Sequence, residues 1–280
     1  MNARNVEEIE VDLLCEAILQ RWGYDFRDYA RDALMRRFKG FMRRRGIEQL
    51  SGLIPCILHD EQCFAECLES VPVIVTGMFR DAGFYRSLVE LVFPHLAEYP
   101  LLKIWIAGCA TGEEAYSLAV LLQEAGLLAR SRIYATDFST LALDVARSGI
   151  YSIDKLKSCT SNYQAAGGQG RFHDYYGEKY AAFAMHEELR AHITFANHNL
   201  VTDGVFCEAQ LIICRNVLFY FNEKLQHRVM TQYCESLCDL GFFCLGARES
   251  LGDPETAKLF QAISKKWRIF KKLPTASPPA

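Results

Sequence analysis

The residues with the clearest chemical potential lie at positions 104–118, where an apolar run meets two glycines and then a helical pattern. Gly108 and Gly112 lack a Cβ atom, so the backbone can turn sharply and a ligand can approach it closely. The helix that follows presents unpaired N–H groups at its start, which favour a polar or anionic group. A capping box formed by Thr111 and Glu114 explains the same residues without any ligand, so the turn alone leaves both interpretations open.

A single acidic residue, Asp137, follows the next apolar run, about 25 positions beyond Gly112. In a doubly wound fold this place belongs to a carboxylate that accepts hydrogen bonds from both hydroxyls of a ribose. The alternative is that Asp137 caps the helix beginning at Leu141, a role that Ser139 could also fill. The chain lacks the glycine patterns of nicotinamide dinucleotide and nucleoside triphosphate sites, so an adenosine-type cofactor without phosphates fits better.

These residues need secondary structure that brings them to one edge of a sheet. After residue 71 the sequence alternates short β-rich runs with helical ones, which predicts an α/β fold with a parallel sheet covered by helices. We expect strands at 103–107, 132–136, 210–214, 242–245 and 267–270, and helices at 111–125, 141–148 and 223–239.

The chain divides into segments that differ in residue composition and in the spacing of apolar residues. Residues 1–70 repeat apolar side chains at three- and four-residue spacing, which predicts a small all-helical domain before a second domain at 71–273. Residues 152–192 are polar and rich in glycine, tyrosine and histidine, and predict a subdomain inserted into that second domain. Residues 274–280 are proline-rich and predict a tail.

The composition excludes several classes of protein. Half of the 280 side chains are hydrophobic, yet no apolar run reaches the roughly 18 to 20 residues of a membrane span. The start of the chain is acidic and lacks the pattern of a signal peptide, so we expect a cytoplasmic protein. The net charge of -3 gives no sign of a nucleic-acid partner. The 11 cysteines are scattered without zinc-site spacing, so we expect reduced thiols and no metal site.

Positive charge concentrates between Arg21 and Arg45, where nine basic residues face three acidic ones. A solvated helix face explains such a run, because surface helices are commonly charged. The sharper interpretation is a docking surface for an acidic partner, whose binding would weaken as salt is added.

Six short motifs occur in the same order as in the chemotaxis receptor methyltransferases of the CheR type, which the chain resembles over essentially its whole length. The motifs are Thr76-Gly-Met-Phe-Arg-Asp, Ala107-Gly-Cys-Ala-Thr-Gly-Glu-Glu-Ala-Tyr-Ser, Ala135-Thr-Asp-Phe-Ser, Ala146-Arg-Ser-Gly-Ile-Tyr, Asn199-Leu200 and Cys214-Arg-Asn-Val-Leu-Phe-Tyr-Phe. The resemblance implies an all-helical N-terminal domain and a Rossmann-like methyltransferase domain with a small β-subdomain insertion. It also implies methyl transfer from S-adenosylmethionine to glutamate side chains of chemoreceptors, with S-adenosylhomocysteine as the second product.

The resemblance further implies roles for single residues at the transfer site. Thr76 and Arg80 would lie at the cofactor and the transferred methyl group, with Arg80 orienting a carboxylate through a two-pronged hydrogen bond. Glu114 would meet the methionine end of the cofactor, and Asp137 would take its ribose. Tyr220 would line the place of methyl transfer, although it could equally be a half-buried aromatic residue.

A second group of residues would surround the rest of the cofactor. The resemblance implies that Asn199 and Leu200 frame the adenine, and that Asn216 and Val217 lie beside the cofactor after the predicted strand 210–214. Each has a simpler explanation, because leucine and valine are ordinary core residues and asparagine is a common turn former.

The chain departs from the family pattern at two positions beside the first motif. Met78-Phe79 stands where the pattern usually has two phenylalanines, and Ile74 stands where some members have an asparagine that contacts the cofactor. We expect cofactor binding to survive both changes. In some members the inserted subdomain binds a short peptide at the receptor's C-terminus, and the sequence does not decide whether 152–192 does so.

The leading hypothesis is therefore a monomeric protein-glutamate O-methyltransferase that acts on the cytoplasmic helical bundle of a chemoreceptor, docking through Arg21–Arg45. One alternative is a relative that methylates another sensor or a small carboxylic acid. The other is a regulatory module that binds S-adenosylmethionine or its product without catalysis.

Overall fold

The computed structural model describes residues 5–70, 76–252 and 254–274. These residues divide into two compact units. The first unit takes the described part of Met1–Ile74 together with Leu218–Arg228, and the second takes the described parts of Val75–Val217 and Val229–Ala280. A segment that follows the sheet strand at 209–214 therefore belongs to the helical unit.

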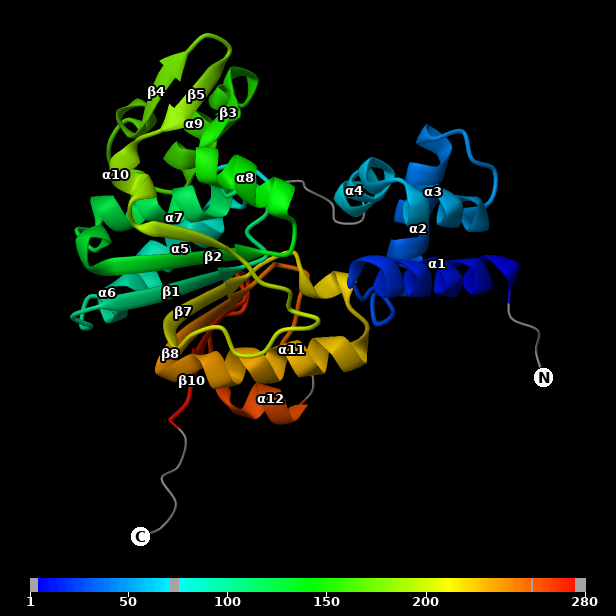
Figure 1. Ribbon diagram of the computed structural model, residues 1–280. Coiled ribbons are helices and arrows are strands. Elements are labelled where there is room, and N and C mark those ends of the chain that lie inside the picture. Colours follow the sequence, from blue (N-terminus) through cyan, green and yellow to red (C-terminus); the bar gives the residue numbers. More distant parts are fainter. Residues whose placement is uncertain (1–4, 71–75, 253, 275–280) are drawn as a thin grey trace. The chain divides into compact units, whose positions relative to one another are not determined.

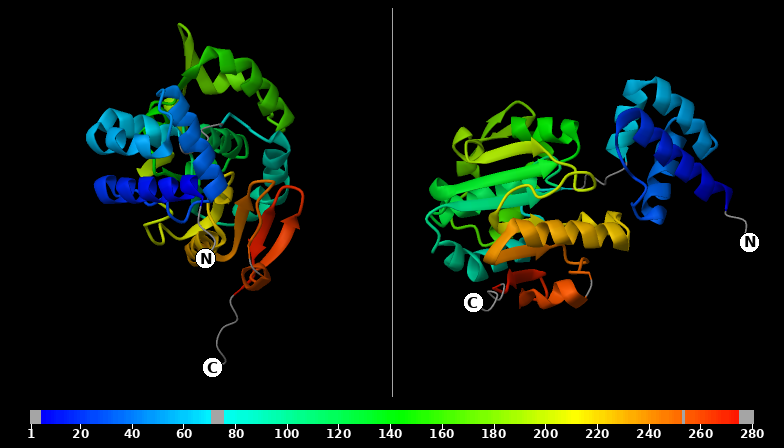
Figure 2. Two further views of the ribbon diagram at one scale, coloured as in Figure 1. Left: turned by 90° about the vertical axis from the view of Figure 1, so that its right-hand side faces the viewer. Right: turned by 60° about the horizontal axis from the view of Figure 1, so that its bottom comes forward.

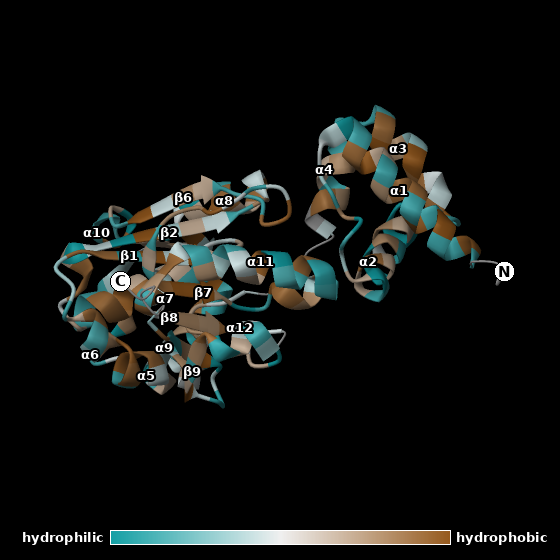
Figure 3. Cartoon of the chain, turned by 90° about the horizontal axis from the view of Figure 1, so that it is seen from below, coloured by the Kyte–Doolittle hydropathy of each residue, from teal (hydrophilic) through white to brown (hydrophobic). Residues whose placement is uncertain are grey.

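The first unit is built from helices that hide one apolar face each (Figure 3). They are α1 (Val6–Trp22), α2 (Arg31–Arg44), the 3-10 turn Leu50–Gly52, α3 (Leu53–His59) and α4 (Glu61–Ser70). In α2 the buried residues Leu34, Phe38 and Phe41 recur at three- and four-residue spacing, which explains both the helix and its packing. Helix α1 ends at Gly23, whose φ of 78° favours glycine.

The segment Leu218–Arg228 joins this unit through backbone and side-chain hydrogen bonds. It holds the 3-10 turn Leu218–Tyr220 and the start of α11 (Glu223–Ser236). The N–H of Ala30 donates to the carbonyl of Tyr220 at 2.7 Å, and Asn222 Nδ2 donates to Asp28 Oδ1 at 3.1 Å. Both bonds lie just before α2, so this segment helps to fix where α2 begins.

The second unit contains a seven-stranded sheet in the order β6-β2-β1-β7-β8-β10-β9. Five strands run parallel, and β10 runs antiparallel to β8 and β9 at the edge coloured red in Figure 2. The strands are β1 (Leu102–Ala107), β2 (Ser131–Asp137), β6 (Ile193–Asn197), β7 (Ala209–Cys214), β8 (Leu237–Leu245), β9 (Phe260–Ser264) and β10 (Ile269–Lys272).

Helices cover both faces of this sheet, as Figure 1 shows with α7 and α8 on one face and α11 on the other. The chain steps from β1 to β2 in one direction and from β7 to β8 in the opposite direction. Because such crossovers are right-handed, the connecting helices must lie on opposite faces. Outside the subdomain that follows α8, the helices of this unit are α5 (Ala82–Leu91), α6 (Phe93–Leu96), α7 (Glu113–Glu124), α8 (Thr140–Ser148), the part of α11 from Val229 onward and α12 (Pro254–Lys258), with a 3-10 turn at Leu128–Arg130.

A small subdomain follows α8. It consists of β3 (Ile150–Ser152), β4 (Tyr176–Lys179) and β5 (Ala182–Met185) in the antiparallel order β3-β5-β4, with α9 (Leu156–Ala165), α10 (Glu187–Arg190) and 3-10 turns at Ile153–Lys155 and Phe172–Tyr175. Glu124 at the end of α7 links the subdomain to the main sheet domain, because its carboxylate accepts hydrogen bonds from the hydroxyls of Tyr163 and Tyr175.

The predicted fold class is confirmed, and most predicted elements lie within a few residues of the observed ones. The predicted helix at 223–239 is too long, because Leu237 already pairs with Ala209 of β7 and belongs to β8. Strands β6 and β9 and helix α12 carry patterns too short and mixed for the sequence to show them. No helix in the described residues is long and apolar enough to cross a membrane.

The expectation that every cysteine is reduced is wrong. Cys56 of α3 and Cys63 of α4 form a disulfide, with their Cα atoms 6.1 Å apart. The sequence could not show this pairing, because it depends on how two helices turn at the single residue between them, Asp60. The other nine cysteines are free thiols.

Candidate cofactor site

The candidate site lies where the parallel strands end. The turns after β1, β2, β6 and β7 all leave the sheet at its carboxyl edge, and the order of strands reverses between β1 and β7. In open α/β sheets, ligands bind at the carboxyl edge beside such a reversal. This site brings together residues of the second unit that are up to about 140 positions apart in the chain.

The turn after β1 keeps a shape that only small residues allow. Gly108 has a φ of 76°, and a Cβ atom there would lie 2.4 Å from Cγ2 of Val217, which follows β7. Gly112 has a φ of 90°, and a Cβ atom there would lie 2.8 Å from the Cβ of Ala146 in α8. The two glycines therefore let the ends of β1, β7 and α8 approach closely, as predicted for the turn.

Asp137 is the last residue of β2, and its carboxylate stabilises the turn that follows β1. Its Oδ2 accepts a hydrogen bond from the N–H of Ala110 at 2.9 Å, and its Oδ1 accepts one from the N–H of Ser139 at 2.9 Å. Burial raises the pKa of Asp137 above its usual range, while backbone N–H donors oppose that rise. The capping alternative for Asp137 is wrong, because Ser139 caps α8 by accepting from the N–H of Ala142.

The capping-box alternative for Thr111 and Glu114 is wrong as well. Helix α7 begins at Glu113 after Gly112, without a side-chain cap. The hydroxyl of Thr111 donates to Glu113 Oε2 at 2.6 Å, and Lys155 lies 3.3 Å from the other oxygen of that buried carboxylate. Glu114 is thus not explained by a cap and faces a different partner.

That partner is Arg215, which the sequence did not single out. Arg215 Nη1 donates to Glu114 Oε1 at 2.7 Å, and Nη2 donates to Asp81 Oδ2 at 2.6 Å. The side chain of Arg215 is only 4% exposed, and its guanidinium lies 4.1 Å above the ring of Phe84. Burial alone would lower the pKa of Arg215, but Glu114 and its other neighbours raise it overall, so the group stays charged.

This buried arginine also fixes the loop that carries Arg80. Both terminal nitrogens of Arg215 donate to the carbonyl of Arg80 at 3.4 Å. Phe79 and Asp81 flank Arg80 with φ values of 54° and 60°, which are strained for residues other than glycine. Phe79 is also held by Ser117, whose hydroxyl accepts from its N–H at 2.8 Å. The loop therefore presents Arg80 in one strained, well-supported conformation.

Thr76 stands half-buried at the start of the same loop, and Met78 is buried against α7 beside Ser117. Met78, which stands in place of the first phenylalanine of the family pattern, therefore fills a core position. Ile74, the other departure from that pattern, lies outside the described residues.

The turn after β6 carries Asn199 and Leu200. Asn199 Oδ1 accepts from the N–H of Val201 at 3.0 Å, so its side chain shapes a turn, and Leu200 is 8% exposed. The neighbouring His198 is buried against Trp105, and in the described part of the chain its Nδ1 has no hydrogen-bond partner. A polar acceptor or donor thus remains unused at this edge.

Asn216 and Val217 follow β7 and are held by a carboxylate that the sequence did not reveal. Glu249, only 4% exposed after β8, accepts hydrogen bonds from the N–H groups of Asn216 at 3.0 Å, Val217 at 2.8 Å and Gly246 at 2.7 Å. Asn216 has a φ of 63°, so it does form a turn. The Glu249 carboxylate fixes the backbone beside Gly108.

Tyr220 belongs to the first unit, where its carbonyl accepts from Ala30 and its ring packs on Phe219 at 4.3 Å between centroids. The structure thus brings Thr76, Arg80, Gly108, Glu114, Asp137, Asn199, Leu200, Asn216 and Val217 into one unit, and Tyr220 into the other.

The donors and acceptors at this edge fit an adenosine-type group. A carboxylate has room for about four hydrogen bonds, so Asp137 can accept from two ribose hydroxyls besides its backbone donors. The second oxygen of Glu114 accepts no hydrogen bond from the described residues, so it can meet a positive charge. The residues that would hold the cofactor are thus present with unused capacity.

Comparisons with known proteins agree with this fit. Residues 75–269 match the family "CheR methyltransferase, SAM binding domain", and residues 9–71 match "CheR methyltransferase, all-alpha domain". The fold and the matched domain define an S-adenosylmethionine-dependent methyltransferase. The chain belongs to the CheR methyltransferase family.

Relatives cover nearly the whole chain. Cher3 of Pseudomonas putida is 42% identical over 272 residues, which span 97% of this chain and 100% of that protein. The chemotaxis protein methyltransferase of Salmonella typhimurium is 28% identical over 250 residues, 86% of this chain and 83% of that protein. The solved N-methyltransferase NodS of Bradyrhizobium japonicum covers 71% of this chain and 90% of that one at 13% identity, with a TM-score of 0.38.

Proposed function

We propose that this protein transfers a methyl group from S-adenosylmethionine to glutamate side chains in the cytoplasmic helical part of a chemoreceptor, which forms γ-glutamyl methyl esters. The observation that carries the proposal is the match of both CheR domains, in order, to the two parts of the chain. Two relatives that match this chain over most of their own length are named chemotaxis protein methyltransferases. The protein would therefore act in the cytoplasm.

The acceptor asks little of the protein's side chains. A glutamate has an unperturbed pKa of about 4.3, so at neutral pH it is already an anion and needs no general base. S-adenosylmethionine, when bound, supplies an electrophilic methyl group on a sulfonium. The work of the chain is to align the carboxylate with that methyl group and to exclude water from it.

The second unit offers the binding groups for this task. We assign the ribose hydroxyls to Asp137 and the positively charged end of the methionine part to the second oxygen of Glu114. The remaining residues assigned to the cofactor are those at the ends of β1, β6 and β7 and in the loop before α5, namely Gly108, Asn199, Leu200, Asn216, Val217 and Thr76.

Arg80 is the group that we assign to orienting a carboxylate during transfer. Its backbone is fixed by Arg215 and by the strained residues on either side, so its side chain starts from a defined place. A guanidinium can hold both oxygens of a carboxylate at once, whereas an ammonium cannot. The role assigned to Tyr220, contact with the acceptor, stays a prediction.

Replacement of Arg80 separates an enzyme from a cofactor-binding sensor. With methyl-labelled S-adenosylmethionine and membranes that carry chemoreceptors, we expect Arg80→Ala to lower the transfer rate about 100-fold or more, as losses of a charge-stabilising group commonly do. We expect Arg80→Lys to restore only part of the rate. Calorimetry should show that both variants still bind S-adenosylhomocysteine. Unchanged transfer by Arg80→Ala would remove Arg80 from the mechanism.

The docking surface that we propose is a stripe of arginines on α2, within the basic segment Arg21–Arg45. Arg36, Arg37, Arg43 and Arg44 form no ion pair in the described part of the chain. Residues seven apart on a helix differ by only about 20° in direction, so Arg43 lies in line with Arg36 and Arg44 in line with Arg37, in two rows on adjacent sides of α2. The other charges are largely neutralised by partners, since Arg31 pairs with Asp12, Lys39 with Glu7 and Arg45 with Glu66.

Charge reversal on this stripe tests the docking proposal. We expect the triple variant Arg36→Glu, Arg43→Glu and Arg44→Glu to lower receptor methylation about tenfold or more at low salt, because steering by opposite charges is lost. Affinity for S-adenosylmethionine should stay unchanged. The control reverses three exposed charges of the second unit, Arg132, Lys157 and Lys265. Equal methylation by the two triple variants would exclude the stripe as a docking surface.

A further inference from the structure

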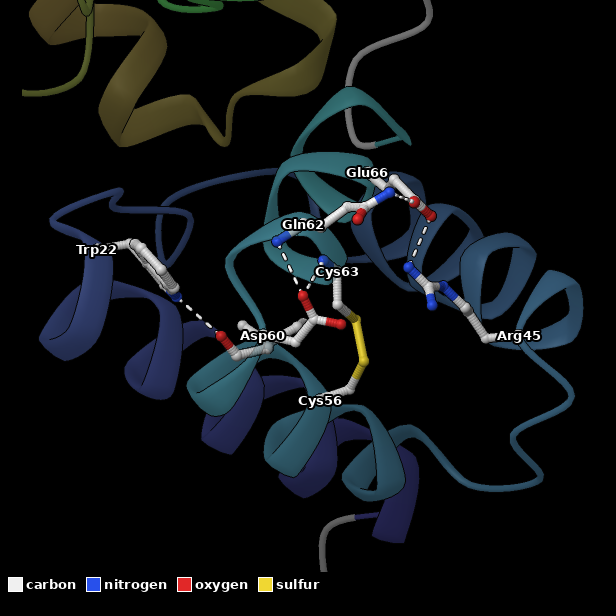
Figure 4. The surroundings of a disulfide bond; sticks show 8 residues. Trp22, Arg45, Cys56, Asp60, Gln62, Cys63 and Glu66 are labelled. Carbon is white, nitrogen blue, oxygen red and sulfur yellow. Dashed lines mark hydrogen bonds and ion pairs between the residues drawn. A yellow bond between two sulfur atoms is a disulfide. The ribbon is translucent and has the colours of Figure 1, made fainter.

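The disulfide between Cys56 and Cys63 lies in a hairpin of two short helices. Helix α3 ends at His59, Asp60 makes the turn, and α4 begins at Glu61 (Figure 4). The carboxylate of Asp60 caps α4 by accepting from the N–H groups of Gln62 at 2.9 Å and Cys63 at 3.1 Å. The disulfide closes the same hairpin from its side, so covalent and hydrogen bonds act on one turn.

Both ends of the basic segment are fastened to this hairpin. At one end Trp22 Nε1 donates to the carbonyl of Ile57 at 2.9 Å, and Arg21 Nε donates to that of Leu58 at 3.3 Å. At the other end Arg45 Nη2 donates to Glu66 Oε2 at 2.7 Å. The first two carbonyls follow Cys56 directly in α3, and Glu66 lies nearly one turn after Cys63 in α4.

The ring of Trp22 links the two helices a second time. It stacks on Phe64, the residue after Cys63, with centroids 4.5 Å apart and planes 1° from parallel. Trp22 thus contacts α3 through its nitrogen and α4 through its ring. A change in the distance between the two helices must disturb Trp22, and through it the end of α1 and the start of the basic segment.

We propose that Cys56–Cys63 is a thiol–disulfide exchange site, opened by a cysteine-containing dithiol reductant, and that its state controls how firmly the basic segment is held for docking. A disulfide in a protein that acts in the cytoplasm is usually transient, catalytic or redox-sensing. The docking part of this inference rests on the proposed function. The exchange site itself rests on the hairpin and on the cytoplasmic location that belongs to that proposed function, and it does not depend on docking.

The solvent exposure of Cys56 and Cys63 decides which of the two sulfur atoms a reductant attacks. Cys63 is 0% exposed, whereas Cys56 is partly exposed. A thiolate of the reductant attacks Cys56 Sγ, forms a mixed disulfide there and releases Cys63 as a thiolate, which takes up a proton. The second thiol of the reductant then attacks the reductant's first sulfur in the mixed disulfide and releases Cys56 as a thiolate, which also takes up a proton. The reductant leaves oxidised to its disulfide, and Cys56 and Cys63 are both thiols.

The neighbouring free cysteine is not part of this chemistry. Cys67 lies one turn after Cys63 on α4 and is 1% exposed. Burial raises the pKa of Cys67 to about 12, so it remains a thiol and does not attack the disulfide. It therefore provides a matched control for the two bonded cysteines.

The test compares oxidised full-length protein with the same protein reduced by dithiothreitol. We expect reduction to raise hydrogen exchange of backbone amides in 21–45 and in α3 about tenfold, since local opening becomes easier. Reoxidation should reverse it. The Cys56→Ser/Cys63→Ser variant should exchange fast with or without reductant, while Cys67→Ser should respond as the unaltered protein does.

The effect of the disulfide on docking is then measured as the affinity of the oxidised and the reduced protein for poly-L-glutamate at low salt. We expect reduction to weaken this binding about threefold or more, because a mobile helix presents its charges less often in one array. Exchange rates in 21–45 that are the same in both redox states would overturn the proposal, and so would a redox response that survives in Cys56→Ser/Cys63→Ser. If exchange responds but neither form binds the polyanion, the docking proposal fails and the exchange site stands.

Discussion

Arg215→Met lowers the free energy of unfolding by about 3–5 kcal/mol, the range found when a buried ion pair loses one partner. Methionine keeps roughly the length of the side chain but leaves Glu114, whose side chain is 13% exposed, without its positive partner. It also removes the donors that hold the Arg80 carbonyl. Denaturant unfolding followed by fluorescence measures the loss.

A surface pair supplies the control for this variant. Arg147 lies 2.8 Å from Asp144, but both side chains are well exposed, so Arg147→Met should cost no more than about 1 kcal/mol. Adding Glu114→Gln to Arg215→Met removes the unpaired charge and should recover part of the stability. A loss for Arg215→Met as small as that for Arg147→Met would show that the buried network does not support the loop.

Asp137→Ala lowers the affinity for S-adenosylmethionine by about 100-fold or more. Each hydrogen bond to a charged group contributes about 1.5–3 kcal/mol, and every 1.4 kcal/mol changes affinity about tenfold, so two ribose hydroxyls account for this loss. Calorimetric titration measures it directly. Asp144→Ala, at an exposed carboxylate on the neighbouring helix α8, should bind as tightly as the unaltered protein.

Asp137→Asn separates binding from support of the turn. The amide oxygen can still accept one of the two backbone hydrogen bonds, from Ala110 or Ser139, but it carries no charge. We expect this variant to unfold at a somewhat lower midpoint, because its amide nitrogen faces the second backbone N–H, and to bind the cofactor weakly. Full affinity in both Asp137 variants would place the ribose elsewhere.

Those parts of the site that depend on neighbouring residues could be predicted from the sequence. The strand, the glycine turn and the following helix form one continuous segment, so the spacing of Gly108 and Gly112 already indicates a close approach of backbones. Asp137 likewise stands at the end of its own strand. Such signals are local, because each element is recognised from its own periodicity.

Contacts between distant parts of the chain could not be predicted in this way. Arg215 is separated by 101 residues from Glu114 and by 134 from Asp81. Glu249 meets backbone groups 32 and 33 residues away. Nothing in the local pattern distinguishes these two charges from solvated ones, and only the return of β7 and β8 to the same edge of the sheet brings them there. Cys56 and Cys63 are only seven residues apart, but their pairing also could not be predicted, because it depends on how two helices turn at Asp60.

The most direct test of the central claim is the chemical nature of the bond that the protein makes. Purified protein is incubated with methyl-labelled S-adenosylmethionine and membranes that carry chemoreceptors, and the labelled receptor is then treated with mild alkali. We predict label on the receptor that alkali releases as volatile methanol, as a glutamyl methyl ester requires. Receptor label that resists alkali, or no receptor label while small carboxylic acids are methylated, would contradict it.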